Sequence, residues 1–525
     1  MKTHNQLAAL TIAALGALTP WTPGHAQVVP PPPTTLPAPL TLQDAIGIAL
    51  QHQPQEYIAR NQVSQAQGQK QQAKAQYYPK LTPSYQFQNR TQSLYGLNTG
   101  SSVTTTTGTG TTGTTGTGTT GIGTGTTGTG TTGIGTGTTG TTGTTGTGTG
   151  VSSRTINEVS IVRGGGLAVS LTQNLYDGGA REATNAQARR ALDAAEFSRV
   201  ETRQGIILAV TQDFYQLLLA QDLVKVARAQ VARFQQTVEV TQAQIAAGTV
   251  AAKDVYQAQA DLASAQVTLL QNQNQVRIIS AALKTDLGVE TNDPVQPAPL
   301  PAAPAPGGAA AATPATTIVL PAQPNPGPAM TLDEAMTTAY TSRPDLRQQQ
   351  AIVESSHTAL RQAQRDAGLK LGADYVLDYQ ATNDVGARGL SSQLLVTGSY
   401  PLFDAGAARG AVRVSQAQFD SARNQLEQAR QQIRQGVEQS YMTRQFSLQA
   451  AQLAQAAVTA AQVNYDAAVA SRQAGVGTVQ DITLAQATLT QSQNQYVTAI
   501  YNFYTADAQL QRAIGTNDTA YLATR

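Results

Sequence analysis

Thr41-Leu-Gln-Asp44-Ala recurs in this chain as Thr331-Leu-Asp-Glu334-Ala, and a proline follows at the same distance in both places, Pro54 and Pro344. A threonine followed three residues later by an acidic residue is the pattern of a capping box. Each copy therefore predicts the start of a helix.

Two further motifs recur, in the same order. Leu175-Tyr-Asp177-Gly-Gly179 returns as Leu402-Phe-Asp404-Ala-Gly406, and Gly248 with Asp254 returns as Gly475 with Asp481. The first motif pair is offset by 290 residues and these by 227, so we expect one structural unit used twice, with an insertion of 63 residues in the first copy.

The insertion is a low-complexity tract. From Thr104 to Gly150 every residue is Thr or Gly except Ile122 and Ile134. Gly disfavours helices and the tract has almost no apolar side chains to bury, so we expect it to be disordered and solvated. It is either a tolerated repeat expansion or a hydrophilic screen, possible sites of Thr glycosylation included.

The N-terminal residues predict export. Lys2, an apolar run over residues 7–18 and the small residues around Gly24-His-Ala26 resemble a secretory signal peptide, which predicts a mature start at Gln27. Past residue 26 there is no apolar run of 18 residues, so any bilayer-spanning part should consist of strands. The chain has no cysteine, which excludes disulfides and lipid attachment at a cysteine.

The charge balance argues against a nucleic-acid ligand. The 34 basic and 32 acidic residues are mixed throughout, and no basic stripe stands out. Only 13% of residues are charged, where about 25% is usual.

Four long helices are expected, at residues 180–247, 252–288, 407–473 and 479–515, because these stretches have no proline and almost no glycine. The first would be roughly 100 Å long at 1.5 Å per residue. Their thin apolar seams, set in Ala, Ser and Gln, suit a wall one helix thick with water on both sides. An ordinary coiled-coil rod is the alternative.

Four strands are expected from alternation of apolar and polar residues, at residues 83–88, 167–172, 371–379 and 390–400. Four strands cannot close a barrel, and lipid does not tolerate an open sheet edge. Two chains would give eight strands, which leave no channel, whereas three chains give twelve. The predicted fold class is thus mixed α and transmembrane β: a trimeric 12-strand barrel, four strands per chain, continuous with a long α-helical tunnel.

The expected organisation follows from these features. In chain order it comprises a signal peptide at 1–26, a Pro-rich segment at 27–40, a first repeat at 41–293 with a Thr/Gly-rich loop at 99–150, a Pro-rich linker at 294–329, a second repeat at 330–518 and a tail at 519–525.

The repeated motifs resemble the TolC-type outer membrane efflux protein family. The resemblance is clearest in Thr331-Leu-Asp-Glu-Ala-Met, in Leu402-Phe-Asp404-Ala-Gly406 and in Gly475-Val-Gly-Thr-Val-Gln-Asp481, and it spans about Thr41 to Asp518. It implies a homotrimeric channel of the outer membrane that reaches into the periplasm. The channel would serve a tripartite efflux or type I secretion system and conduct substrates passively from a periplasmic adaptor and an inner-membrane pump.

The resemblance also assigns roles to residues. The tips of the helical hairpins would dock the adaptor; the residues concerned are Gly248, Thr249, Asp254, Gly475, Gly477, Thr478 and Asp481. Asp177, Gly179, Asp404 and Gly406 are expected to cap helices at the barrel–tunnel joint, since Asp before a helix is an N-cap by default. Asp466 and Arg472 are the candidates for a gate, with a solvated helix face as the alternative for Asp466.

Catalysis is not expected. Beyond the signal segment only His52 and His357 occur, each without a metal-spaced partner, and no cofactor motif is present. The alternative functions are a trimeric surface adhesin or a coiled-coil structural protein. The transported substrate does not follow from the fold.

Overall fold

The structure is a computed structural model that describes residues 36–93, 159–246, 252–291, 293–300, 320–324, 330–382, 388–474 and 476–518. The helices and strands, in chain order, are α2 (Leu42–His52), α3 (Pro54–Ala75), β1 (Lys80–Ser93), β2 (Val159–Tyr176), α4 (Ala180–Ala246), α5 (Ala252–Leu287), α6 (Leu332–Ser342), α7 (Pro344–Arg365), β3 (Lys370–Thr382), β4 (Arg388–Ser399), α8 (Ala407–Gln473) and α9 (Val479–Ala513).

The chain forms two compact units. The strand unit comprises Lys80–Thr172 and Ala373–Leu395, and the helical unit comprises Met1–Pro79, Gln173–Gly372 and Val396–Arg525. The predicted signal peptide, the Thr/Gly-rich loop and the C-terminal tail lie outside the described residues.

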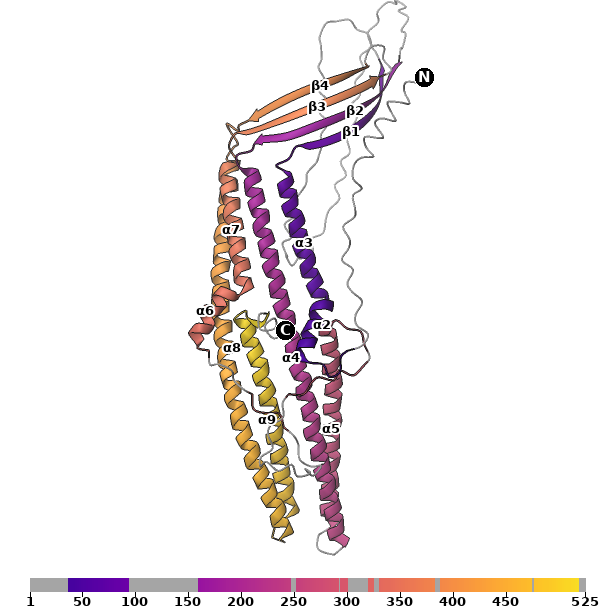
Figure 1. Ribbon diagram of the computed structural model, residues 1–525, viewed down its shortest axis with the longest axis vertical. Helices are drawn as coiled ribbons and strands as arrows, with labels where there is room; N and C mark the ends of the chain where they lie inside the picture. Colours follow the sequence, from indigo (N-terminus) through magenta and orange to yellow (C-terminus); the bar gives the residue numbers. More distant parts are fainter. Residues whose placement is uncertain are drawn as a thin grey trace, which may run out of the picture. The chain divides into compact units, whose positions relative to one another are not determined.

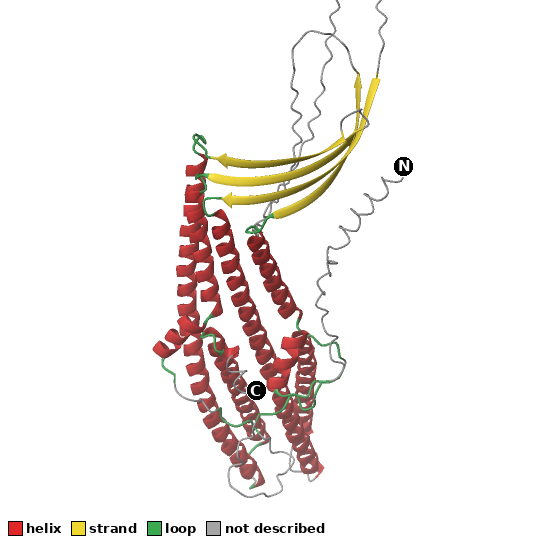
Figure 2. Cartoon of the chain, turned by 45° about the horizontal axis from the view of Figure 1, so that its top comes forward, coloured by secondary structure: helices red, strands yellow, loops and turns green. Residues whose placement is uncertain are grey.

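The four strands form one sheet in the order β1-β2-β3-β4 (Figure 2). They lie where the alternation of residues predicted strands, and β1 and β2 extend well beyond the predicted ranges. β1 and β2 pair antiparallel from Lys80 opposite Thr172 to Ser93 opposite Val159.

A tyrosine and a glycine fit together across this pair. Tyr85 pairs with Leu167, and a Cβ added to the neighbouring Gly165 would lie only 2.8 Å from the Tyr85 Oη. Glycine therefore leaves the room that the tyrosine ring occupies, an arrangement known to pin register in sheets.

One set of alternate positions carries exposed apolar side chains. In β1 they are Leu81, Tyr85 and Phe87, at 67%, 69% and 66% exposure, and in β4 Leu390 and Leu394 are 69% and 68% exposed. A water-soluble sheet would bury such a face, whereas the lipid-facing side of a membrane sheet leaves it outward.

The helical unit consists of two copies of one arrangement (Figure 1). In each copy a short helix and a 22-residue helix precede the strands, and a 67-residue helix follows them and pairs with a return helix. The breaks between long and return helices fall where glycine predicted them. Among the described residues, no helix combines the length and apolar character needed to cross a bilayer.

The repeat extends to the core side chains. Ala45 and Ala49 of α2 are fully buried, and so are their equivalents 290 residues later, Ala335 and Ala339 of α6. On the long helices, the equivalent pairs include Ile206 with Ile433 and Val210 with Val437, all of them at most 3% exposed. Each copy thus builds its core from the same positions, as expected for a duplicated unit.

A tight backbone contact closes each copy. Gly288 and Gly515, which follow the return helices, have φ of +67° and +79°, a conformation that favours glycine. A Cβ on Gly288 would lie 2.8 Å from the His52 carbonyl oxygen, and one on Gly515 would lie 3.1 Å from the Arg343 Cα. The return helix therefore ends against the break between the two short helices in both copies.

The two predicted capping boxes differ in detail. Thr331 and Glu334 form the complete box, with a hydrogen bond in each direction between side chain and backbone. The Thr41 hydroxyl accepts from the Asp44 N–H but donates to the Asp44 carboxylate at 2.6 Å, so this acid makes no bond to the Thr41 N–H among the described contacts. The shorter Asp side chain meets the hydroxyl in place of the backbone.

Both described ends of the Pro-rich linker pack against the helical unit. Leu40 and Pro297 form a parallel β-bridge, and Val295 is buried in the core of the first copy. At the other end, the Tyr496 hydroxyl donates to the Pro321 carbonyl at 3.0 Å. These residues contribute to packing, which a passive spacer would not require.

Candidate functional site

The turn before α4 is ordered by one carboxylate. Asp177 accepts hydrogen bonds from the Gly179 N–H at 3.2 Å and the Arg181 N–H at 3.0 Å, so it satisfies donors that the helix start leaves free. The Arg181 guanidinium donates to the same carboxylate at 3.0 Å and to the carbonyls of Asn174 and Leu175. The last residues of β2 and the first turn of α4 are thereby tied together.

The turn before α8 repeats this arrangement. Asp404 accepts from the Ala408 N–H at 2.7 Å and the Gly406 N–H at 2.9 Å, and these backbone bonds lower the pKa of its carboxyl group. By backbone conformation, however, the N-cap residue of α8 is Gly406, with φ of +89°. The expectation that Asp404 itself occupies the N-cap is wrong by two residues, because a left-handed Gly-containing turn separates it from the helix.

A pocket of about 630 Å³ lies beside the Asp177 turn, between the start of α4 and the end of α7. Its lining includes Tyr77, Tyr176, Arg181, Glu182, Arg365 and Tyr400. All of these residues belong to the helical unit.

At the tip of the second hairpin, Thr478 caps α9. Its hydroxyl accepts from the Asp481 N–H, and the Asp481 carboxylate accepts from the Thr478 N–H at 2.8 Å, which completes a capping box. The bonds from the Thr478 side chain and backbone lower the pKa of Asp481. Gly477 is needed here, because a Cβ would come within 3.0 Å of the Arg472 backbone nitrogen. Val476 beside it is 83% exposed.

The tip of the first hairpin is described only in part. Asp254 lies in the first turn of α5, half-buried, whereas Gly248 and Thr249 lie outside the described residues, as does Gly475 of the second tip.

The two gate candidates have different surroundings. The Arg472 guanidinium donates to the Gly477 carbonyl at 3.2 Å and to the Gln244 side chain, so it joins the ends of α8 and α4. Asp466 is exposed and accepts a hydrogen bond from Gln462 on its own helix at 3.0 Å. Only Arg472, of these two, forms a described link between the two helical hairpins.

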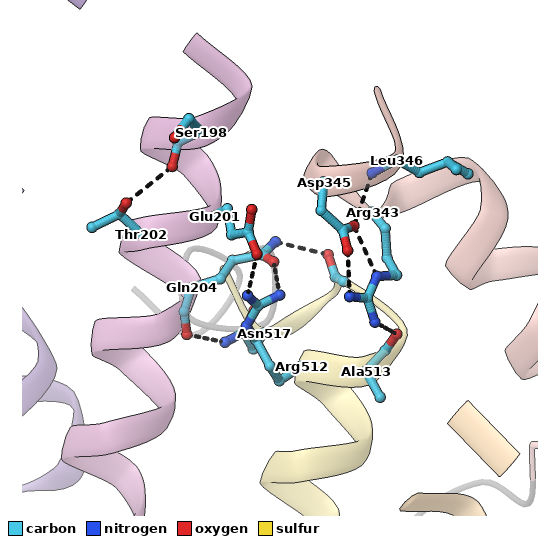
Figure 3. Close-up of polar contacts among 11 residues, drawn as sticks. Ser198, Glu201, Thr202, Gln204, Arg343, Asp345, Leu346, Arg512, Ala513 and Asn517 are labelled. Atoms are coloured by element: carbon cyan, nitrogen blue, oxygen red, sulfur yellow. Dashed lines mark hydrogen bonds and ion pairs between the residues drawn. The ribbon is translucent and has the colours of Figure 1, made fainter. Parts of the chain in front are cut away.

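A polar cluster that the sequence analysis did not identify lies where α9 meets α4 (Figure 3). Arg512 donates to Gln204 at 3.0 Å and to Glu201 at 3.3 Å. Gln204 in turn donates to the Gly515 carbonyl and accepts from Asn517 through its own carbonyl, at 3.1 and 2.8 Å. Burial lowers the pKa of Arg512, and Glu201 partly offsets this.

The adjacent part of the cluster belongs to the break between α6 and α7. Arg343 binds Asp345 through two hydrogen bonds of 2.9 and 2.6 Å and donates to the Ala513 carbonyl at 2.9 Å (Figure 3). Although burial opposes it, the bonding to Arg343 lowers the pKa of Asp345. The equivalent residue in the first copy is Gln53, so the cation is specific to the second copy.

A buried carboxylate was also missed. Glu56 is 2% exposed, and its Oε1 accepts from Arg60 at 3.0 Å and from Arg199 at 2.8 Å. Its equivalent in the second copy is Leu346, which is also buried. Comparison of the two copies would have singled out Glu56, since a charge replaces a core leucine there.

Among the described residues, no group of three or more His, Cys, Asp or Glu side chains could hold a metal ion. His357 stacks against Phe419 with ring centroids 5.2 Å apart. The arrangement offers helix ends, tethers and packing contacts, which suit a conduit.

Comparisons with known proteins agree with this description. The family model for outer membrane efflux proteins matches residues 137–289 and 336–516, one stretch in each repeat. No curated protein matches the chain in a sequence search.

Several solved structures share the fold. VceC from Vibrio cholerae is 18% identical, with a TM-score of 0.65 over 90% of this chain and 96% of its own. The Campylobacter jejuni CmeC outer membrane channel is 14% identical, with a TM-score of 0.65 over 91% and 86%. The Neisseria gonorrhoeae MtrE outer membrane channel, solved in its open state, is 14% identical, with a TM-score of 0.63 over 91% and 89%.

Proposed function

We propose that this chain, which belongs to the outer membrane efflux protein family, forms its channel as a homotrimer coupled to a periplasmic adaptor and an inner-membrane pump. The family is a channel family rather than an enzyme class, and its location is the outer membrane with an extension into the periplasm. The observation that carries the function is the match of this family to both repeats.

The sheet supports the trimer. β1 and β4 are the outer strands of the four-stranded sheet, and each has one neighbour among the described strands. A strand edge open to lipid leaves backbone groups unsatisfied, so strands of other chains must complete it. Twelve strands from three chains would leave a channel, whereas eight would be filled by side chains.

The long helices support it as well. α4 and α8 have the same length and the same place in their repeats, yet 20 residues of α4 are buried and only six of α8. α4 contacts α7 and α9 of the second repeat. By the same relation, α8 should contact α3 and α5 of the next chain, which explains why Phe446 and Leu453 of α8 are 71% and 73% exposed.

The internal repeat assigns residue pairs to this interface. Within the chain, Arg233 of α4 donates to Gln493 of α9 at 3.3 Å. The offset of 227 converts these positions to Ala460 of α8 and Gln266 of α5, both exposed. In the trimer, Ala460 of one chain should therefore lie near Gln266 of the next.

Crosslinking tests the arrangement. The protein has no cysteine, so a chain carrying Gln266→Cys and Ala460→Cys reacts only at these two positions. A short bifunctional thiol reagent should give a covalent trimer on a denaturing gel, without larger species. The control pairs Gln266→Cys with Gln428→Cys, an exposed position roughly 48 Å away along α8 at 1.5 Å per residue, and should give monomers. Equal crosslinking of both pairs, or a covalent dimer as the end product, would contradict the trimer.

We place adaptor docking at the hairpin tips, supported by the capped Thr478–Asp481 turn and the exposed Val476. Replacing Gly475 and Gly477 with Val should abolish efflux in cells while trimers still reach the outer membrane, because the tip can no longer turn. Full efflux in the double variant would show that the tips do not dock the adaptor.

Arg472 is the better gate candidate of the two, because its side chain joins two hairpins. Arg472→Ala should raise single-channel conductance in planar bilayers. Asp466→Ala, which removes an exposed carboxylate bonded within one helix, should leave conductance unchanged. If neither variant changes conductance, Arg472 is a structural tether.

A further inference from the structure

The pocket beside the Asp177 turn is not used by conduction, docking or gating, yet its size and composition are those of a binding site. Its volume of about 630 Å³ falls within the range of roughly 300–1,000 Å³ of small-molecule sites. It lies just after the end of β2 and before α4, and three tyrosines contribute to its lining.

The pocket holds two charges of opposite sign that do not pair with each other. Among the described contacts, neither the Arg365 guanidinium nor the Glu182 carboxylate forms an ion pair or a side-chain hydrogen bond. Both flank Gly179: a Cβ there would lie 3.4 Å from the Arg365 Nη1 and 4.0 Å from the Glu182 Oε2. The pocket also contains Arg181 and Asp177, but these bind each other at 3.0 Å.

Such a pair suits a ligand that carries both charges. A guanidinium binds a phosphate through parallel hydrogen bonds. A carboxylate and the faces of tyrosine rings bind an ammonium group. The Tyr77 ring already faces the Arg181 guanidinium at 5.5 Å, which leaves Tyr176 and Tyr400, 51% and 61% exposed, for the ligand.

The position points to a lipid. Tyr176 ends β2 and Tyr400 follows β4, and tyrosines at strand ends mark the level of the headgroups in outer-membrane proteins. Leu402 and Phe403, which follow Tyr400, are 92% and 88% exposed. Exposed apolar side chains beside a polar pocket fit a molecule with acyl chains better than a soluble zwitterion.

We infer that this pocket binds the phosphoethanolamine headgroup of a membrane phospholipid, with the phosphate on Arg365 and the ammonium group on Glu182. The equivalent positions in the other copy are Ala75 and Arg409, which lack this pair of charges. The stoichiometry is therefore one lipid per chain. The inference rests on the outer-membrane location of the family and not on the proposed trimer contacts or gate.

Native mass spectrometry of the purified oligomer tests the site. After delipidation, the protein is offered equal amounts of phosphatidylethanolamine and phosphatidylglycerol with the same acyl chains. The wild type should retain phosphatidylethanolamine preferentially, up to one per chain. Arg365→Gln should weaken this binding about tenfold, because a charge-assisted contact to phosphate is lost. Glu182→Gln should remove the preference between the two lipids, because only phosphatidylethanolamine carries the amine.

Arg361→Gln provides the matched control, since Arg361 is exposed on the same helix one turn earlier and does not line the pocket. It should bind lipid as the wild type does, and unchanged conductance of all variants should confirm intact channels. Equal retention of both lipids by the wild type, or wild-type binding by Arg365→Gln, would overturn the site. Glycerophosphoethanolamine, which lacks acyl chains, should compete poorly; if it displaced the lipid at equal concentration, the lipid assignment would be wrong.

Discussion

The glycines that close the two repeats allow a quantitative test of the fold. Gly288→Ala would place a Cβ 2.8 Å from the His52 carbonyl oxygen, a distance at which backbone must move. A left-handed conformation costs an L-residue roughly 1–2 kcal/mol, and overpacking adds about 1–3 kcal/mol. Gly288→Ala should thus destabilise the helical unit by about 2–5 kcal/mol.

Two matched variants set the scale. Gly515→Ala has the same backbone conformation but a nearest contact of 3.1 Å, so its cost should be smaller, about 1–3 kcal/mol. Gly205→Ala lies inside α4 with no atom within 4 Å of the added Cβ, and better helix propensity should stabilise by about 0.5–1 kcal/mol.

The assay is thermal unfolding of the helices in detergent, followed by circular dichroism at 222 nm, a conventional wavelength for helix signal that is independent of this protein's structure (~222 nm). The midpoints should rank Gly205→Ala highest, then wild type, Gly515→Ala and Gly288→Ala. A Gly288→Ala midpoint at or above that of the wild type would refute the close approach of the return helix to the break between the short helices.

Three further predictions address buried polar groups. Glu56→Leu, which installs the residue of the second repeat, should keep most of the thermal stability, whereas Glu56→Ala should lose about 1–3 kcal/mol because a cavity forms, measured by the same unfolding assay. Tyr501→Phe should destabilise by about 1–2 kcal/mol, since the buried Asp222 carboxylate loses a 2.7 Å hydrogen bond. Burial and the charge of Asp286 raise the pKa of Asp213, and burial raises that of Asp286. An acid with a raised folded-state pKa loses stability as the pH rises above its ordinary value of 3.8, so Asp286→Asn should raise the unfolding midpoint at neutral pH, with the gain vanishing near pH 3.8 or below.

The sequence predicted the fold well because its signals are local and doubled. Capping residues, prolines and glycines mark helix ends, and alternation of side chains marks strands, so the long elements were placed within a few residues. The exception at Asp404 arose because its bonds reach across a left-handed turn, which residue type alone does not reveal.

The polar clusters were harder to predict because they join distant residues. Arg512 and Glu201 are 311 residues apart in the chain, and no periodicity connects them. A difference between the repeats, such as Gln53 against Arg343, is the signal that could have located them. The pairing of Arg472 with Gln244 likewise depends on how the two hairpins pack.

The fit of Tyr85 against Gly165 has a consequence for how the protein can change. β1 and β2 are separated by residues 94–158, too long a connection for turn geometry to set the register, and a slip of one residue would move every side chain to the opposite face. Because the strands align through their own side chains, the connection between them can be lengthened, shortened or replaced without altering the pore. The part of the gene that encodes it is thus free to vary independently of transport, and foreign peptides inserted there should leave the conduit intact.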